Sequence, residues 1–241
     1  IVNIGLEGMM VIGTWFGAWA GWFYGPWYGV LAGLLGGALF GLIHAVGTIT
    51  FQVDHIVSGV AINILAAGVA RFLSVVAYAD VPAGGATQSP RVDERIEKIS
   101  IPYLSGGKIN ESDTADVFGS LEALDLFLIS DLFGLLGGLT RNISYFSILA
   151  VLLVPISVWI LWSTSFGLQL RSVGEYPVGS ESVGVNVYLM KYIGVTISGA
   201  FAGLAGAYLV IESAGIYREG QTGGRGFIGL AAMIFGNWKP L

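Results

Sequence analysis

Long apolar stretches separated by short polar turns are the feature that most constrains this chain. A helix needs about 20 mostly apolar residues to cross a bilayer. Stretches of that kind occupy residues 6–24, 27–50, 56–79, 143–166 and 192–211. Charged residues make up only 11% of the chain, whereas soluble domains carry about 25%. The sequence therefore predicts an all-α, polytopic transmembrane helical bundle with about five to six spans.

A last apolar stretch, at residues 227–238, is shorter than the others. A helix of that length does not cross a bilayer, so we expect it to be re-entrant or cut short. The chain also begins inside an apolar run at Ile1. We therefore expect residues 1–241 to form a single transmembrane domain that belongs to a longer membrane protein.

Small residues recur at every fourth position in several of the predicted spans, which places each set on one helix face. Such a face lets helix backbones approach closely, so the sequence predicts a tightly packed bundle. The sets are Gly13, Gly17, Gly21 and Gly25; Gly29, Gly33, Gly37 and Gly41; Gly194, Ser198, Ala202 and Gly206; and Gly199, Gly203 and Ala207.

Residues 80–142 hold most of the charge and several proline and Gly-Gly positions, which are typical of irregular structure. We interpret this segment as an extracytoplasmic insertion. Within it, apolar residues fall three or four apart with acidic residues between them, and this spacing predicts a helix lying in the membrane interface. The apolar residues are Val117, Phe118, Leu121, Leu124, Leu128, Leu132 and Leu135.

A polar island at residues 171–191 separates the last two long stretches. Its middle, residues 179–185, is predicted to form a short helix after Pro177, with Ser180 as a possible N-cap. A short helix on a tight loop can pass a rigid displacement to a soluble partner. An ordinary solvated loop explains the same spacing, because runs of charge are usually solvated faces.

The sidedness of the turns follows from alternation along the chain. If the island is cytoplasmic, the turn at Asp54 lies on the same side. The turn at Gly25-Pro26 and the insertion at residues 80–142 then lie outside. The basic residues Arg171 and Lys191 in the island support this orientation modestly.

Four runs of residues resemble signatures of a known family. They are NIGLEGMM at 3–10, IVSGVAIN at 56–63, the run from 167 to 209 that contains the polar island, and GRGFI at 224–228 with GNW at 236–238. Together they are similar to permease subunits of ABC importers in the branched-chain amino acid, ribose and nucleoside superfamily. The likeness is strongest to the simple-sugar and nucleoside branch.

The resemblance implies the ABC importer permease fold and a membrane subunit that translocates a nucleoside or simple sugar, driven by a separate ATPase subunit. In that family the loop corresponding to residues 171–191 seats a coupling helix in the ATPase. The resemblance therefore implies a cytoplasmic coupling loop here. The residues that take this role are Gly174, Glu175, Pro177, Ser180, Glu181, Gly184 and Asn186.

The resemblance also implies partners. They are an ABC ATPase subunit, a second permease subunit that is identical or homologous, an extracytoplasmic solute-binding protein that docks on the outer face, and membrane lipids. The chain is expected to be a multi-pass protein of the cell (inner or plasma) membrane. We expect no enzymatic activity and no cofactor in the chain itself. Nucleic acid is not expected as a partner, because the net charge is −5 and phosphate binding relies on clustered basic residues.

Two other functions remain open on the sequence. One is a branched-chain amino acid ABC permease, which shares the superfamily. The other is a membrane scaffold without a translocation path, in which the glycines serve packing alone.

Three residues are candidates for the substrate path: Glu7, Asn63 and Phe227. Glu7 is the one acid within the first apolar stretch, and carboxylates inside a membrane are rare and often functional. A structural role at the end of a helix is the more common explanation for such a residue. Asn63 is able to hydrogen-bond either a solute hydroxyl or a neighbouring helix. Hydrogen bonds between helices are the more frequent case.

His44 and His55 are too isolated to form a metal site, which needs several converging ligands. We expect a packing histidine and a turn residue. The run MVIGTW at 10–15 also resembles MIFGNW at 233–238. Related broken segments in two halves point to a central site in transporters, although chance similarity between glycine-rich helices explains the match equally well.

Overall fold

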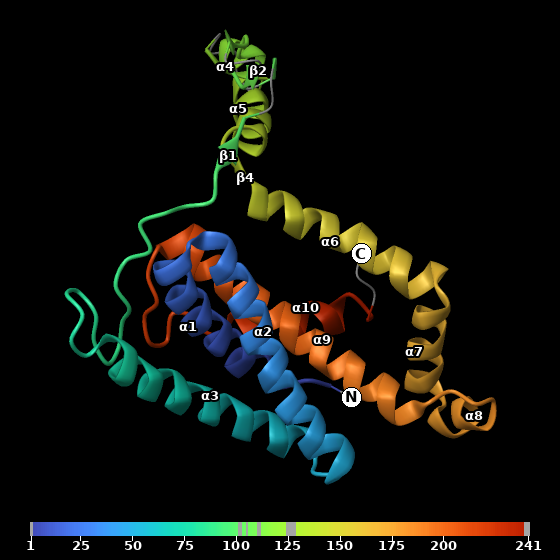
Figure 1. The fold of residues 1–241 in the computed structure, drawn as a ribbon. Helices are drawn as coiled ribbons and strands as arrows, with labels where there is room; N and C mark the ends of the chain where they lie inside the picture. Colours follow the sequence, from blue (N-terminus) through green and yellow to red (C-terminus); the bar gives the residue numbers. More distant parts are fainter. Residues whose placement is uncertain (1, 101–102, 105, 110–111, 124–128, 239–241) are drawn as a thin grey trace. The chain divides into compact units, whose positions relative to one another are not determined.

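The computed structural model describes residues 2–100, 103–104, 106–109, 112–123 and 129–238 (Figure 1). The chain divides into two compact units, and we describe each by itself. The helical unit comprises Ile1–Arg95 and Val154–Leu241, and the small unit comprises residues 96–153.

The helical unit is built from long helices joined by short turns. Its elements are α1 (Leu6–Tyr24), α2 (Pro26–Ala45) continued by a π-helical turn η1 (Val46–Thr50), α3 (His55–Tyr78), α7 (Ser165–Glu175), α8 (Pro177–Ser182), α9 (Val187–Tyr208) continued by a π-helical turn η2 (Leu209–Ala214), and α10 (Arg225–Phe235). Helix α6 (Tyr145–Ser163) begins in the small unit and ends in the helical unit.

Four helices in the described chain are long and apolar enough to cross a membrane: Pro26–Thr50, His55–Tyr78, Tyr145–Ser163 and Val187–Ala214. Helix α1 has the bounds predicted for the first span, but it is not among these four. Its glutamate, glycines and tryptophans lower its hydropathy, and most of its residues pack inside the bundle rather than facing lipid. Helix α10 has 11 residues and is therefore about 16 Å long, too short to cross.

Local sequence explains where these helices begin and end. Gly25 adopts a φ of 99°, which favours glycine, and Pro26 follows at the first position of α2, where its fixed φ suits a helix start. The Asp54 carboxylate caps α3 by accepting hydrogen bonds from the backbone N–H groups of Ile56 (2.8 Å) and Val57 (3.1 Å). Thr164 caps α7 in the same way, so the predicted fourth span ends at Ser163 rather than at residue 166.

Helices α1, α2 and α9 pack against one another through glycine backbone (Figure 1). A Cβ built on Gly29 would lie 2.6 Å from the carbonyl oxygen of Gly17, and one on Gly203 would lie 2.8 Å from Cα of Gly37. Cβ atoms essentially never come within 3.0 Å of a heavy atom to which they are not closely linked by covalent bonds. The predicted small-residue faces are therefore confirmed for α1, for α2 and for the Gly199, Gly203 and Ala207 face of α9, except that Gly25 lies in the turn after α1 rather than on its packed face.

The opposite side of α1 packs against α3 through large side chains. Met9, Ile12 and Trp15 are buried there with Ile62 and other residues of α3. The Trp15 indole Nε1–H donates a hydrogen bond to Ser74 Oγ at 2.9 Å, and Ser74 in turn donates to the Ala70 carbonyl at 2.8 Å. Helix α1 is thus enclosed on one side by backbone and on the other by a hydrophobic core.

The turns of the helical unit gather at two ends. At one end, residues 80–95 pack on residues 215–219: the Val92 N–H donates to the Gly215 carbonyl (2.8 Å), and the Ser89 N–H donates to the Tyr217 carbonyl (3.1 Å). Burial, with the charge of Glu219, raises the pKa of the Tyr217 hydroxyl to about 12, so it stays protonated at physiological pH. Residues 80–95 therefore belong to the helical unit and not to a separate insertion.

At the other end, residues 48–55 and the polar island form the two walls of a groove of about 370 Å³. The Asp54 turn and the island thus share one end of the unit. Glycine 25 lies beside Glu94 at the opposite end. This arrangement agrees with the alternation of turns predicted from the sequence.

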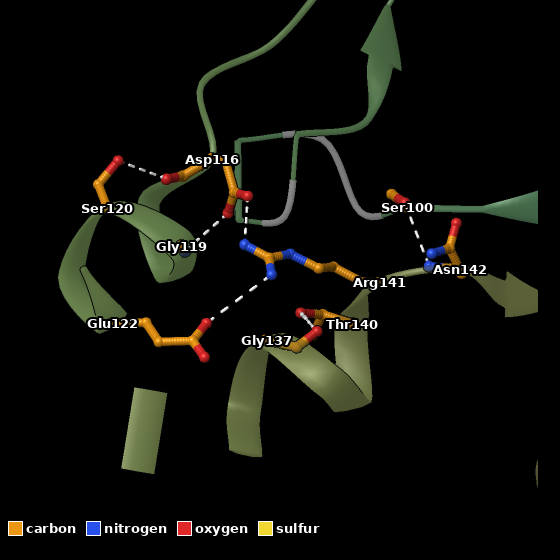
Figure 2. A network of polar contacts seen from close by, with 9 residues as sticks. All are labelled: Ser100, Asp116, Gly119, Ser120, Glu122, Gly137, Thr140, Arg141 and Asn142. Carbon is orange, nitrogen blue, oxygen red and sulfur yellow. Dashed lines mark hydrogen bonds and ion pairs between the residues drawn. The ribbon is translucent and has the colours of Figure 1, made fainter. Parts of the chain in front are cut away.

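The small unit contains two short antiparallel pairs, β1 (Lys98–Ile99) with β4 (Ile143–Ser144) and β2 (Lys108–Ile109) with β3 (Ser112–Asp113), and two helices, α4 (Val117–Glu122) and α5 (Ile129–Thr140). Figure 2 shows its polar centre. Arg141 binds the Asp116 carboxylate and lies 3.8 Å from Glu122 Oε2, while Asp116 also caps α4 by accepting from the Gly119 N–H at 2.8 Å. The sequence predicted one interfacial helix with apolar residues from Val117 to Leu135. The described residues form α4 and α5 on either side of residues 124–128, and Leu124 and Leu128 lie outside the described residues.

The glycine interface generates a matched pair of substitutions. Gly203→Ala places a methyl group against the backbone of α2, so we expect a loss of about 1–3 kcal/mol in stability from overpacking. Gly68→Ala adds the same methyl group to α3 where nothing lies within 4 Å, so stability should be unchanged or slightly higher. Thermal unfolding in detergent compares the two variants. Equal Tm values would contradict the backbone-to-backbone contact.

Candidate functional site

Glu7 of α1 caps the N-terminus of a different helix. Its Oε1 accepts a hydrogen bond from the Gly224 N–H at 2.9 Å, and its Oε2 accepts from the Gly226 N–H at 2.7 Å. These two donors belong to the start of α10, whose own N-cap residue, Gly224, has no side chain to satisfy them. The Glu7 carboxylate therefore supplies the cap that the local sequence lacks.

Asn63 of α3 caps α1 in the same manner. Its Oδ1 accepts from the Gly8 N–H at 2.7 Å, and its Nδ2 donates to the Ile4 carbonyl at 3.1 Å. Gly8 lies in the first turn of α1, where the N–H groups have no partner inside the helix. Asn63 thus fixes the start of α1, and α1 carries Glu7, which fixes the start of α10.

Asn3 completes the set on the side of α9. Its side chain is buried, donates to Ser198 Oγ at 3.1 Å and to the sulfur of Met9 at 3.2 Å, and accepts from the Gly5 N–H at 3.1 Å. We call Asn3, Glu7, Asn63 and Ser198, with the first turns of α1 and α10, the central polar cluster.

This cluster lies well inside the long helices. Asn63 is eight residues into α3 and Ser198 is 11 residues into α9, which correspond to about 12 Å and 16 Å along the helix axes. The hydrocarbon core of a bilayer is about 30 Å thick. Two helices therefore begin near the middle of the bundle, the arrangement that transporters with broken helices use around a solute.

Two hollows border the cluster. One, of about 500 Å³, lies between the starts of α1 and α10 and the middle of α9. Its walls are mostly apolar, with Ser198 and Arg225 as the polar residues among them. The wall residues are Leu6, Met10, Gly194, Ile197, Ser198, Phe201, Ala202, Ala205, Arg225, Gly226 and Gly229.

The second hollow, of about 860 Å³, shares Leu6, Gly194 and Ser198 with the first. It runs from the central cluster at Asn3 to the polar island at Gly174, Glu175 and Pro177. The small-residue face of Gly194, Ser198 and Ala202, predicted as a packing face, in fact borders these hollows. The island and the centre of the bundle are thus joined by open space within one compact unit.

The candidate solute-path residues do not all meet. Glu7 and Asn63 converge on the first turns of α1 and α10, and each is bound to backbone rather than directed into a hollow. Phe227 lies in the first turn of α10, is 46% exposed, and is not a wall residue of either hollow. Asn3, Ser198 and Arg225 were not predicted as wall or cluster residues. Each lies within a run that carries the family resemblance, which is the signal that could have found them.

The polar island folds as α7, a tight turn, α8 and a second turn into α9. Pro177 occupies the first position of α8, and Gly184 adopts a φ of 87° after it. Asn186 caps α9 by accepting from the Leu189 N–H at 2.9 Å. The side chains of Glu175, Glu181 and Asn186 are exposed, as are Gly174 and Gly184.

Two predictions for the island are corrected. The helix spans Pro177–Ser182 rather than residues 179–185, because proline presets the helix start at its own position. Ser180 is not an N-cap: it lies within α8, is buried, and its Oγ donates to the Tyr176 carbonyl at 3.0 Å. The Ser180 hydroxyl therefore binds the carbonyl of the residue that precedes α8, instead of accepting from an N–H group at a helix start.

The structure also tests the predictions made for the two histidines and for the two similar hexapeptides at residues 10–15 and 233–238. His44 is fully buried, with its Nδ1 2.9 Å from Ser58 Oγ, which confirms it as a packing residue, and His55 begins α3. Residues 10–15 continue as helix, whereas α10 ends at Phe235 and Trp238 has a φ of 63°. The two hexapeptides therefore differ in backbone conformation.

Comparison with known proteins identifies relatives along the whole chain. The family model described as branched-chain amino acid transport system / permease component matches residues 1–241. The chain is 40% identical over 248 residues to the guanosine ABC transporter permease protein NupQ of Bacillus subtilis, and 35% identical over 248 residues to the nucleoside ABC transporter permease protein NupC of Lactococcus lactis. Each alignment covers 100% of this chain and 68% of the relative.

A more distant relative is the putative glucose ABC transporter permease protein TsgC13 of Haloferax volcanii. It is 27% identical over 244 residues, covering 100% of this chain and 63% of the relative. No solved structure matched this chain significantly.

The cap on α1 can be tested by Asn63→Leu. This change leaves the Gly8 N–H and the Ile4 carbonyl without their partner, so we expect a loss of about 1–3 kcal/mol in stability. Ala67→Leu is the control, because it adds leucine to an exposed position of the same helix and should not destabilise. Thermal unfolding in detergent measures both, and a wild-type Tm for Asn63→Leu would argue against the cap.

Proposed function

Since this chain belongs to the family of branched-chain amino acid transport system permease components, we propose that it is the permease subunit of an ABC importer for a nucleoside. The observation that carries the proposal is the 40% identity to a guanosine permease along the entire chain. The chain is a multi-pass membrane protein, and we propose the cytoplasmic membrane as its location.

The hollow between α1, α9 and α10 suits such a solute. Small-molecule sites have volumes of about 300–1,000 Å³, mostly apolar walls and a few placed polar groups. This hollow has about 500 Å³ and offers Leu6, Met10 and Phe201 for a base, with Ser198 and Arg225 as hydrogen-bonding groups. We propose that guanosine or a related nucleoside passes through it, and that Glu7 and Asn63 hold its walls in place.

The energy comes from a separate ATPase subunit in this proposal. Helix α8 is the coupling element, because it stands at the end of the unit on two tight turns, and the helix together with its two flanking residues exposes apolar side chains. Val183 is 79% exposed, Val178 67% and Tyr176 65%. Exposed apolar patches on a polar loop mark sites of protein contact.

Further partners follow from the same proposal. A second permease subunit, identical or homologous, forms the other half of the path, and an extracytoplasmic solute-binding protein delivers the solute. The end that carries the Asp54 turn and the island is then cytoplasmic. The binding protein docks at the opposite end, where residues 80–95 lie, or on the small unit.

The solute is tested by uptake. With its ATPase and binding protein in proteoliposomes, the chain should accumulate labelled guanosine only when ATP is present inside the compartment that holds the ATPase. Excess unlabelled leucine should not compete, because a nucleoside site has no place for an amino acid. Uptake of leucine without uptake of guanosine would establish the amino acid alternative, and transport of neither solute would favour a scaffold.

The coupling role of α8 is tested by Glu181→Arg and Val183→Asp. Both side chains are exposed, so the fold should be retained, whereas loss of a hot-spot residue at an interface costs about 2 kcal/mol or more in binding. We therefore expect the ATPase to copurify at least tenfold less well, by roughly the conversion of 1.4 kcal/mol per factor of ten. Asp80→Arg, on an exposed turn at the opposite end, is the control. Undiminished copurification of the α8 variants would remove α8 from the ATPase interface.

A further inference from the structure

We propose that the Glu7 carboxylate is a built-in anion that closes the N-terminus of α10 and so keeps negatively charged solutes out of the adjoining hollow. The effect of this cap on solute choice rests on the proposed transport function. The cap itself does not rest on that function, because it follows from the contacts of Glu7 alone.

Both oxygens of Glu7 are used at this terminus. They accept from the N–H groups of Gly224 (2.9 Å) and Gly226 (2.7 Å). The intervening N–H, of Arg225, donates to the Thr222 carbonyl at 3.0 Å, and the Ile228 N–H donates to the Gly224 carbonyl. A helix N-terminus attracts anions through such N–H groups, and here these donors already have acceptors.

The two backbones leave no layer between them for a ligand. A Cβ built on Gly226 would lie 2.6 Å from both N and Cα of Glu7, so only glycine permits this approach. An external carboxylate or phosphate therefore cannot reach these donors while Glu7 holds them.

The second helix start at the centre also has side-chain acceptors for two of its N–H groups. Asn63 Oδ1 takes the Gly8 N–H, and Asn3 Oδ1 takes the Gly5 N–H. Arg225 is the cationic wall residue of the hollow, and its Nη1 donates to the carbonyl oxygens of Gln221 (2.9 Å) and Thr222 (3.2 Å). Glu7 binds the backbone N–H groups of the residues on either side of Arg225, so one acidic and one basic residue stand at this helix start beside the hollow.

An uncharged nucleoside fits this environment, because it needs no counter-charge. A nucleotide phosphate would meet a fixed carboxylate and helix N–H groups that Glu7, Asn63 and Asn3 already occupy. The free carboxylate of an amino acid meets the same obstacle. The structure thus selects the solute by charge before any contact with the base or sugar is considered.

The test removes the built-in anion and supplies one from solution. In Glu7→Ala, the donors of Gly224 and Gly226 lose their acceptor, and formate is small enough to take its place. We expect the purified complete transporter with this change to have a lower Tm, and formate to raise that Tm by several degrees. Binding to the folded state alone stabilises a protein in this way. Formate should leave the Tm of the wild type unchanged.

Two further variants make the result specific. Glu7→Gln keeps the shape but lacks the charge and places an amide donor against a backbone donor, so it should be destabilised and not respond to formate. Glu219→Ala removes an exposed carboxylate that pairs with Arg71 at 3.6 Å and should be insensitive to formate. Equal formate effects on wild type and Glu7→Ala would overturn the proposal, as would a Glu7→Gln transporter as stable as the wild type.

Uptake adds the functional readout. We expect Glu7→Ala to lower guanosine uptake by about tenfold, from loss of two charge-assisted hydrogen bonds, and formate to restore part of it. Guanosine 5′-monophosphate should inhibit uptake by Glu7→Ala but not by the wild type. If the wild type takes up no guanosine, the proposed function fails, while the formate effect on Tm still decides the role of Glu7. Inhibition of both proteins by the monophosphate would contradict the exclusion of anions.

Discussion

Inside a membrane, a helix that starts away from the surface must find partners for its first N–H groups without water. This chain meets that requirement with side chains from other helices: Asn63 of α3 serves α1, and Glu7 of α1 serves α10. The starts of both helices therefore depend on a chain of contacts that begins in α3. The hollows and the placement of Arg225 both follow from having helix starts at this depth.

Glycine has two different consequences in the bundle. On the shared faces of α1, α2 and α9 it brings backbones into contact and leaves no space. On another face of α9, Gly194 borders open space instead, together with Ser198 and Ala202. The same residue spacing thus produces a sealed interface on one side of α9 and the wall of a hollow on the other, because different neighbours face each side.

Hydropathy and residue spacing predicted most helices to within a few residues, since both are local properties. They also predicted the turn at Gly25 and the packing of His44. They did not identify α1 as a buried helix. They favoured a structural role at a helix end for Glu7 but did not assign it to α10, because the Glu7 to Gly224 hydrogen bond joins residues 217 positions apart. Ser180 was misassigned for a local reason: several residues of the island are acceptable caps, and the proline decides among them. The function was predicted from the family resemblance, because residue spacing alone did not distinguish a transporter from a membrane scaffold.

The glycine interface also determines how the bundle is able to move. Side chains that interlock can exchange rotamers and settle into a second packing, but backbone lying on backbone has no rotamers to exchange. Helices α1, α2 and α9 therefore form a single lever, to which α10 is attached through Glu7 and to whose lower end α8 is joined through the cap at Asn186. In the proposed coupling, a push on α8 tilts this lever as a whole, rather than being dissipated between its helices.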